Sequence, residues 1–118
     1  PAICDATIAV LDLLDSDPSY RERLFNNTKI FAEEIGKLGL DVTFRGSPIL
    51  PIMLYDEHKA SEFAARAMEK GICVVAFSYP VVPKGKARIR TQISAALTES
   101  DIRDIVAKFA EIKEEMGL

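Results

Sequence analysis

Positive charge is concentrated in "YPVVPKGKARIRTQISAALT", residues 79–98 of a chain whose net charge is −3. The cations are Lys84, Lys86, Arg88 and Arg90. Arg88 and Arg90 lie two residues apart, so both side chains would point to the same face of a strand. The planar fork of an arginine binds a carboxylate or a phosphate through two hydrogen bonds. The pattern predicts an anion receptor or, alternatively, the solvated outer face of an edge strand.

The loop before the two arginines is stiffened by Pro80 and Pro83, whose rings fix the backbone. Such a loop would hold the start of the following strand in one place. The pattern does not choose between Arg88 and Arg90 as the receptor residue.

The sequence offers little other chemistry. The only histidine, His58, lies between Glu57 and Lys59 and is interpreted as a solvated surface residue rather than a proton carrier. No GxGxxG, P-loop or HExxH motif is present. Cys4 and Cys73 lack the spacing of a zinc site or a redox pair, and we expect reduced, buried thiols.

Length and composition indicate a single domain. The chain has 118 residues, of which 48% are hydrophobic and 28% charged, which allows a real core. The mildly negative charge argues against nucleic-acid binding, which usually requires a basic face. Apolar runs are too short to span a bilayer, so no membrane partner is expected.

Helical periodicity predicts four helices. They cover residues 2–14, 18–38, 57–70 and a terminal segment that begins at Thr98. Asp17 is expected to cap the second helix with Pro18 as its first residue, and Thr98 to form a capping box with Asp101. The residues expected to face the core are Leu24, Phe31, Ile35, Leu38, Phe63, Ala64, Ala67, Met68, Ile102, Ile105, Val106, Phe109 and Ile112.

Alternating and β-branched patterns predict four strands, at residues 40–45, 47–56, 72–78 and 87–94. Pro48 and Pro51 lack amide donors, so they should lie at a sheet edge or where the strand begins. The first two strands should form an antiparallel pair. The order of elements predicts an α+β fold, with a small, mostly antiparallel sheet covered by helices on one face.

The segment "FSYPVVPKGKARIRTQISAALTESDI" closely resembles the C-terminal segment of the glycine C-acetyltransferases, also called 2-amino-3-ketobutyrate coenzyme A ligases. They belong to the α-oxoamine synthases, which are pyridoxal-phosphate enzymes of fold type I. "GSPILPIMLYD" and "KGICVVAFSYP" look like the family's preceding segments. "PAICDATIAVLDLLD" resembles the helix that links the family's large and small domains. The resemblance covers essentially the whole chain.

The resemblance implies a C-terminal small domain, with residues 1–15 as the linking helix and residues 18–118 as the α+β body. The lysine that binds pyridoxal phosphate would lie upstream, so no catalytic or cofactor-binding residue is expected in this chain, and the fragment alone should be inactive. The full-length parent would be a homodimer in a bacterial cytoplasm or a mitochondrial matrix.

The resemblance also implies site residues. The second arginine of "ARIR", Arg90, would bind the carboxylate of the amino-acid substrate. Ser78, Tyr79, Pro80 and Val81 are weaker candidates, in a loop that would line the mouth of the site near the acyl thioester.

Two details are less closely tied to the family pattern. Lys84 and Lys86 are interpreted as solvated residues, with binding of coenzyme A phosphates as the alternative. Leu97 stands in "SAALT" where family members often have "SAAHT", which bears on substrate detail rather than on the fold.

By resemblance, the parent interconverts glycine plus acetyl-CoA and 2-amino-3-ketobutyrate plus CoA, in threonine degradation. One alternative is another α-oxoamine synthase, of the 8-amino-7-oxononanoate synthase or serine palmitoyltransferase type. A second alternative is a free-standing small-molecule-binding module without catalysis. A large exposed apolar patch on the sheet or first helix would argue against that module.

Overall fold

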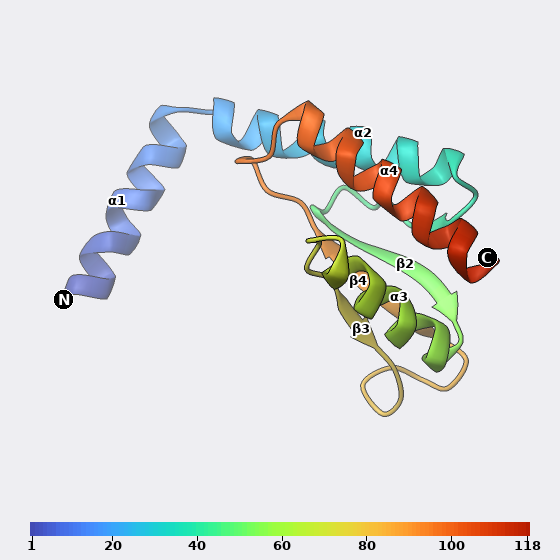
Figure 1. Ribbon diagram of the computed structural model, residues 1–118. Coiled ribbons are helices and arrows are strands. Elements are labelled where there is room, and N and C mark those ends of the chain that lie inside the picture. The colour runs from blue at the N-terminus through green and yellow to red at the C-terminus, as the bar shows by residue number, and fades with distance from the viewer.

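The computed structural model describes residues 1–118, which form four helices and four strands (Figure 1). The helices are α1 (Ala2–Ser16), α2 (Ser19–Lys37), α3 (Glu57–Glu69) and α4 (Glu99–Met116). The strands are β1 (Asp41–Val42), β2 (Ile49–Tyr55), β3 (Val75–Phe77) and β4 (Ala87–Gln92). This is the predicted order of elements.

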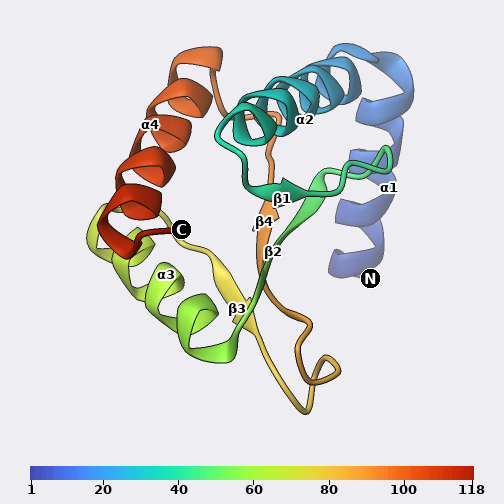
Figure 2. The same ribbon diagram turned by 90° about the vertical axis from the view of Figure 1, so that its right-hand side faces the viewer.

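The four strands form one antiparallel sheet in the order β1-β2-β4-β3. In Figure 2 the sheet is seen beside α2, α3 and α4, which pack together against it. The predicted α+β fold is therefore confirmed. β4 is an interior strand, paired with β2 on one side and β3 on the other, so the arginines are not on an edge strand.

The core lies between the helices and the inner face of the sheet. Every second residue of the central strands points into it, including Leu50 and Ile52 of β2 and Ile89 of β4. The ring of Phe109 makes edge-to-face contacts with Phe31 at 6.1 Å and Phe63 at 5.1 Å between centroids. Burying one such side chain contributes about 1.5–3 kcal/mol, so these rings fix α2, α3 and α4 to one another.

The predicted helix faces are largely confirmed. Fully buried or partly buried residues among them are Leu24, Phe31, Ile35, Leu38, Phe63, Ala64, Ala67, Ile102, Ile105, Val106, Phe109 and Ile112. The prediction that Met68 faces the core is wrong, because its side chain is 56% exposed. The capping box of Thr98 with Asp101 is present. α2 begins one residue later than predicted, with Pro18 at the cap position and the Asp17 carboxylate accepting the Ser19 amide at 2.9 Å.

All four strands are shorter than predicted, and β1 and β3 are shortened most. The amide of Ile72 donates to the carbonyl of Ala67 at 2.8 Å and so closes the end of α3 instead of joining the sheet. β1 stops at Val42, which pairs with Ile52. The next residue of β2 is Pro51, which pairs only with Arg90 of β4. On its other side β2 is an unpaired edge at this position, as predicted. Pro51 has no amide to donate to a longer β1.

α1 extends away from the rest of the molecule (Figure 1) and none of its residues is buried. Its exposed apolar side chains are Ile3, Ile8, Val10, Leu11, Leu13 and Leu14. Cys4 on this helix and Cys73 before β3 are both exposed, so the expectation of buried thiols is wrong. Cys4 is exposed because α1 covers no other element. None of the four helices has the length and hydropathy needed to cross a bilayer.

Candidate functional site

The outer face of the sheet, opposite the helices, presents both arginines of β4. Arg88 is paired with Met53 of β2 and Phe77 of β3, and Arg90 is the next outward residue along the strand. Inward and outward residues alternate along β4, and Ala87, Ile89 and Thr91 are buried. The predicted common face of Arg88 and Arg90 is confirmed.

Arg90 presents a free guanidinium. Its central carbon lies 4.9 Å from the ring centroid of Phe77, and the group makes no hydrogen bond within the chain, in contrast to the guanidinium groups of Arg66, Arg88 and Arg103. No carboxylate lies within 4.0 Å of it. Because Arg90 is exposed on an interior strand, its backbone is held on both sides while its donors remain available to an anion.

Arg88 is directed differently from Arg90. Its Nε donates to the carbonyl of Lys86 at 3.1 Å, and its side chain lines a hollow of about 440 Å³ over β2. Arg90 does not line this hollow. The two arginine side chains therefore lie on one face of the sheet but over different parts of it. The sequence pattern could not predict this difference.

The hollow over β2 is lined by Thr43, Arg45, Ser47, Ile49, Pro51, Met53, Lys86 and Arg88. Three of these residues are cations, and none has a carboxylate within 4.0 Å. Arg45 is not among the residues that the sequence pattern singles out. It lines the same hollow as Arg88 because β2 pairs with β4, and no local motif signals that pairing.

The unpaired cations of the sheet contrast with those of the helices. Carboxylates partner the helical cations Lys29, Lys37, Arg66, Lys70, Arg103 and Lys108. A chain with net negative charge thus neutralises many helical cations internally and leaves those around β4 without carboxylate partners. This distribution favours binding of an anion at the outer face of the sheet.

An acidic side chain does lie at the edge of this face. Asp41 is paired with Met53 across the β1–β2 ladder, and its carboxylate accepts a hydrogen bond from the hydroxyl of Tyr55. That hydrogen bond raises the pKa of Tyr55 above its usual value. The Asp41 carboxylate is thus hydrogen-bonded to a neutral hydroxyl and forms no ion pair with a cation of the hollow.

The loop of residues 78–86 continues from Phe77, the partner of Arg88, and projects away from the helices (Figure 1). The carbonyl of Ser78 accepts the amides of Val81 at 2.9 Å and Val82 at 3.1 Å. Val81 is 70% exposed. The loop thus lies beyond the Arg88 end of β4.

The remaining loop candidates are also at the surface. Tyr79 is exposed, with the ammonium of Lys84 5.1 Å from its ring centroid, and Pro80 follows it through a cis peptide bond. His58 is exposed in the first turn of α3, as predicted.

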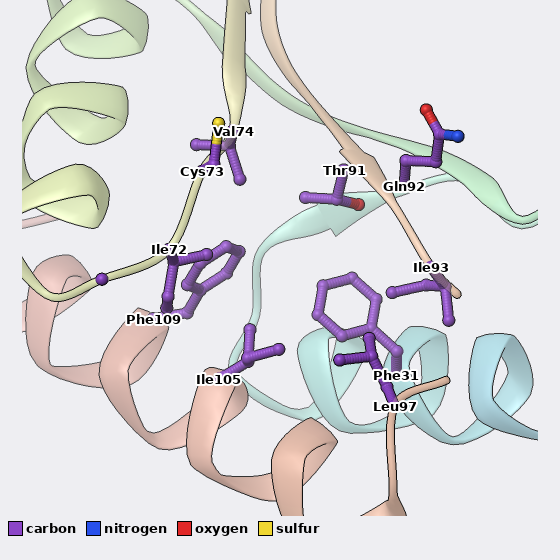
Figure 3. Close-up of a pocket in the computed structure, with 11 residues that line it drawn as sticks. Phe31, Ile72, Cys73, Val74, Thr91, Gln92, Ile93, Leu97, Ile105 and Phe109 are labelled. Carbon is purple, nitrogen blue, oxygen red and sulfur yellow. The ribbon is translucent and has the colours of Figure 1, made fainter. Parts of the chain in front are cut away.

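A second hollow, of about 200 Å³, lies on the helix side of the sheet (Figure 3). Its lining is mainly apolar and includes Leu97, Phe31 and Ile105 but no lysine or arginine. The side-chain nitrogen of the buried Asn27 donates to the carbonyls of Leu97 at 2.7 Å and Ser94 at 3.2 Å. Leu97 therefore helps to build the inner face of the protein, away from Arg90, and this pocket does not suit an anion.

The chain matches the family described as aminotransferase class I and II over residues 2–109. It is 41% identical to 2-amino-3-ketobutyrate coenzyme A ligase from Escherichia coli K12 and 35% identical to 8-amino-7-oxononanoate synthase from Symbiobacterium thermophilum. Both matches cover 100% of the chain but 30% of each relative, so the chain spans less than a third of their length.

Solved structures show the same fold. A variant of serine palmitoyltransferase from S. paucimobilis with a bound PLP–myriocin aldimine superposes with a TM-score of 0.78 and 25% identity. The match covers 84% of this chain and 25% of the other. The fold is that of the C-terminal part of fold type I aminotransferase-like enzymes. The chain belongs to the class I and II aminotransferase family, and its relatives are α-oxoamine synthases.

Proposed function

We propose that this chain is the C-terminal small domain of a pyridoxal-phosphate-dependent glycine C-acetyltransferase. The full-length parent would interconvert glycine plus acetyl-CoA and 2-amino-3-ketobutyrate plus CoA, as a homodimer. Residues 1–15 would link the α+β body, residues 18–118, to the large domain. The observation that carries the proposal is the unpaired guanidinium of Arg90, on an interior strand of a chain 41% identical to an enzyme of that name.

Arg90 would bind the carboxylate of glycine. Glycine has no side chain to bind, so its carboxylate is the main group through which a protein can orient it. A bidentate arginine fixes both carboxylate oxygens and thereby sets the direction of the bonds at Cα. The strand supports this role, since β2 and β3 hold the Arg90 backbone from both sides.

Pyridoxal phosphate, when bound, supplies an electron sink for the bond that breaks at Cα of the substrate. The residues of this chain fit the binding of the substrate in that reaction. The guanidinium of Arg90 is available to a substrate carboxylate, and the lining of the hollow shown in Figure 3 includes no lysine. In line with the resemblance to the α-oxoamine synthases, we propose that the cofactor lysine lies upstream of this segment, and we expect the 118-residue chain alone to be inactive.

The 35% identity to 8-amino-7-oxononanoate synthase supports a second α-oxoamine synthase reaction as the alternative. Rates of the full-length enzyme with glycine, alanine and serine, each against acetyl-CoA and longer acyl-CoA thioesters, would separate these reactions. A strong preference for alanine or serine over glycine would contradict our choice of substrate.

A free-standing binding module is disfavoured by α1, whose apolar side chains have nothing to cover them. Stoichiometric binding of glycine by the 118-residue chain in calorimetry would support that alternative. We expect no binding.

The test of the proposed role is Arg90→Ala in the full-length enzyme. Removing one partner of a hydrogen-bonded charge pair costs about 2–5 kcal/mol, so kcat/KM for glycine should fall at least about thirtyfold. Arg90→Lys should recover part of this loss, because a lysine keeps the charge but not the fork. Arg103→Ala is the matched control, since Arg103 is exposed and paired with Glu99. Equal activity of Arg90→Ala and the control would refute the role of Arg90.

A further inference from the structure

We propose that the hollow over β2 is a phosphate-binding subsite that holds the phosphates of a coenzyme A thioester, separately from the carboxylate receptor Arg90. The inference rests on the proposed function. Its ligand-recognising residues are Arg45, Lys86 and Arg88, which line one hollow of about 440 Å³. That volume lies within the range of small-molecule sites, roughly 300–1,000 Å³.

The three cations come from separate parts of the chain. Arg45 belongs to the connection between β1 and β2, and Lys86 directly precedes β4, which carries Arg88. They are brought together by the antiparallel ladder in which Met53 lies opposite Arg88. Like charges in one hollow repel each other, and no carboxylate within 4.0 Å offsets this repulsion. An anion carrying more than one charge would relieve it.

The chemistry of the lining favours phosphate over carboxylate. Two arginine forks and one lysine offer more donors than a single carboxylate can accept, whereas phosphate groups present several oxygens each. Hydroxyl groups of Thr43 and Ser47 also line the hollow. A single carboxylate is already served by Arg90, which lies outside the hollow.

The rest of the lining is apolar or sulfur-containing. Ile49, Pro51 and Met53 form the β2 side of the hollow, and Ile49 is 43% exposed. Surface of this kind suits the uncharged part of a ligand whose phosphates contact the cations. A coenzyme A thioester has both parts, and the relative with 41% identity bears the name of a coenzyme A ligase.

The experiment uses the full-length enzyme with Arg45→Gln and Arg88→Gln combined. Losing two charge-assisted contacts should raise the KM for acetyl-CoA at least about tenfold. The KM for acetyl-pantetheine, which lacks the phosphates, should stay unchanged, as should the KM for glycine. The matched control is Arg21→Gln with Arg23→Gln on α2, which removes the same charge from exposed positions. Equal KM values for acetyl-CoA in both double variants would overturn the inference.

Calorimetry with CoA, dephospho-CoA and inorganic pyrophosphate separates this inference from the proposed function, because it needs no turnover. Weaker binding of CoA to the Arg45/Arg88 variant would uphold the subsite even if glycine proved not to be the substrate. Normal turnover of glycine with no difference in CoA binding would uphold the proposed function and overturn the subsite. Binding of pyrophosphate without binding of CoA would overturn the thioester as the ligand.

Discussion

The guanidinium of Arg90 lies 4.9 Å from the ring centroid of Phe77 on the neighbouring strand. Phe77 is not the direct partner of Arg90 in the ladder; it pairs with Arg88, two residues away. Arg90 therefore reaches diagonally across the sheet to rest on the ring. The contact limits the directions in which its fork can point.

We expect Phe77→Leu to weaken the orientation of Arg90. A cation–π contact at an exposed site is worth about 0.5–1 kcal/mol, so the KM for glycine in the full-length enzyme should rise about two- to fivefold. Phe77→Tyr keeps the ring and should restore the KM. Tyr20→Leu, which removes the ring under Arg23 on α2, is the control. If the leucine and tyrosine variants had the same KM, the ring would not position Arg90.

Asn27 should contribute to stability through the loop before α4. Asn27→Ala would leave the carbonyls of Ser94 and Leu97 without the donor they share in the folded chain. We expect a loss of about 1–3 kcal/mol in the free energy of unfolding, measured by denaturant titration of the 118-residue chain. The exposed neighbour Asn26 provides the control variant Asn26→Ala, which should differ little from the parent. Equal stabilities would show that the two bonds contribute nothing.

Acid should weaken the start of α4. The backbone amide of Thr98 donates to the Asp101 carboxylate at 2.8 Å and lowers the pKa of Asp101, and the Thr98 hydroxyl adds a further hydrogen bond. Because folding lowers the pKa of this carboxyl, its charged form stabilises the fold at pH values above its usual pKa of 3.8. This stabilisation is lost as the pH falls through the folded-state pKa.

The measurement is the free energy of unfolding of the 118-residue chain and of Asp101→Asn between pH 7 and pH 2. The difference between them should be largest at neutral pH and should shrink below about pH 4. Asp12→Asn on α1 is the control, because Asp12 has no ion pair and α1 has no buried residue. A difference that stayed constant with pH would contradict the role of the charged capping box.

The isolated 118-residue chain should self-associate through α1. Exposed apolar patches on a helix favour association in water, and Ile3 is 84% exposed. Replacing Ile3 and Leu11 with serine should shift the sedimentation velocity toward the monomer without lowering the unfolding free energy of the body. Serine substitutions at Met68 and Val81 are the control, since both side chains are exposed elsewhere. Equal association of the two variants would exclude α1 as the contact.

The sequence predicted the elements whose signals are local. The capping box of Thr98 and the alternation around Ile89 depend on neighbours in the chain, and both are present in the structure. The lengths of β1 and β3 depend on distant partners. Ile72 has strong strand propensity, yet its amide closes α3, which a propensity scale does not register.

In the candidate site, too, the features with local signals were predictable and those that depend on distant partners were not. The shared face of Arg88 and Arg90 follows from strand periodicity. Their side chains point in different directions because they contact different parts of the structure. Arg90 lies over the ring of Phe77, whereas Arg88 lines the hollow together with Arg45. Those contacts depend on the pairing of β4 with two strands that precede it in the sequence. A short stretch of sequence around the arginines therefore could not predict them.

The position of β4 bears on how the protein is synthesised. β4 is the last strand along the chain, yet it lies between β2 and β3, which do not pair with each other. While a ribosome is making the chain, β2 and β3 have no common neighbour until residues 87–92 emerge, and both keep unpaired backbone groups in the meantime. The segment that completes the sheet is also the one that carries Arg90. A nascent chain therefore acquires Arg90, the proposed carboxylate receptor, only in the step that joins the two halves of its sheet.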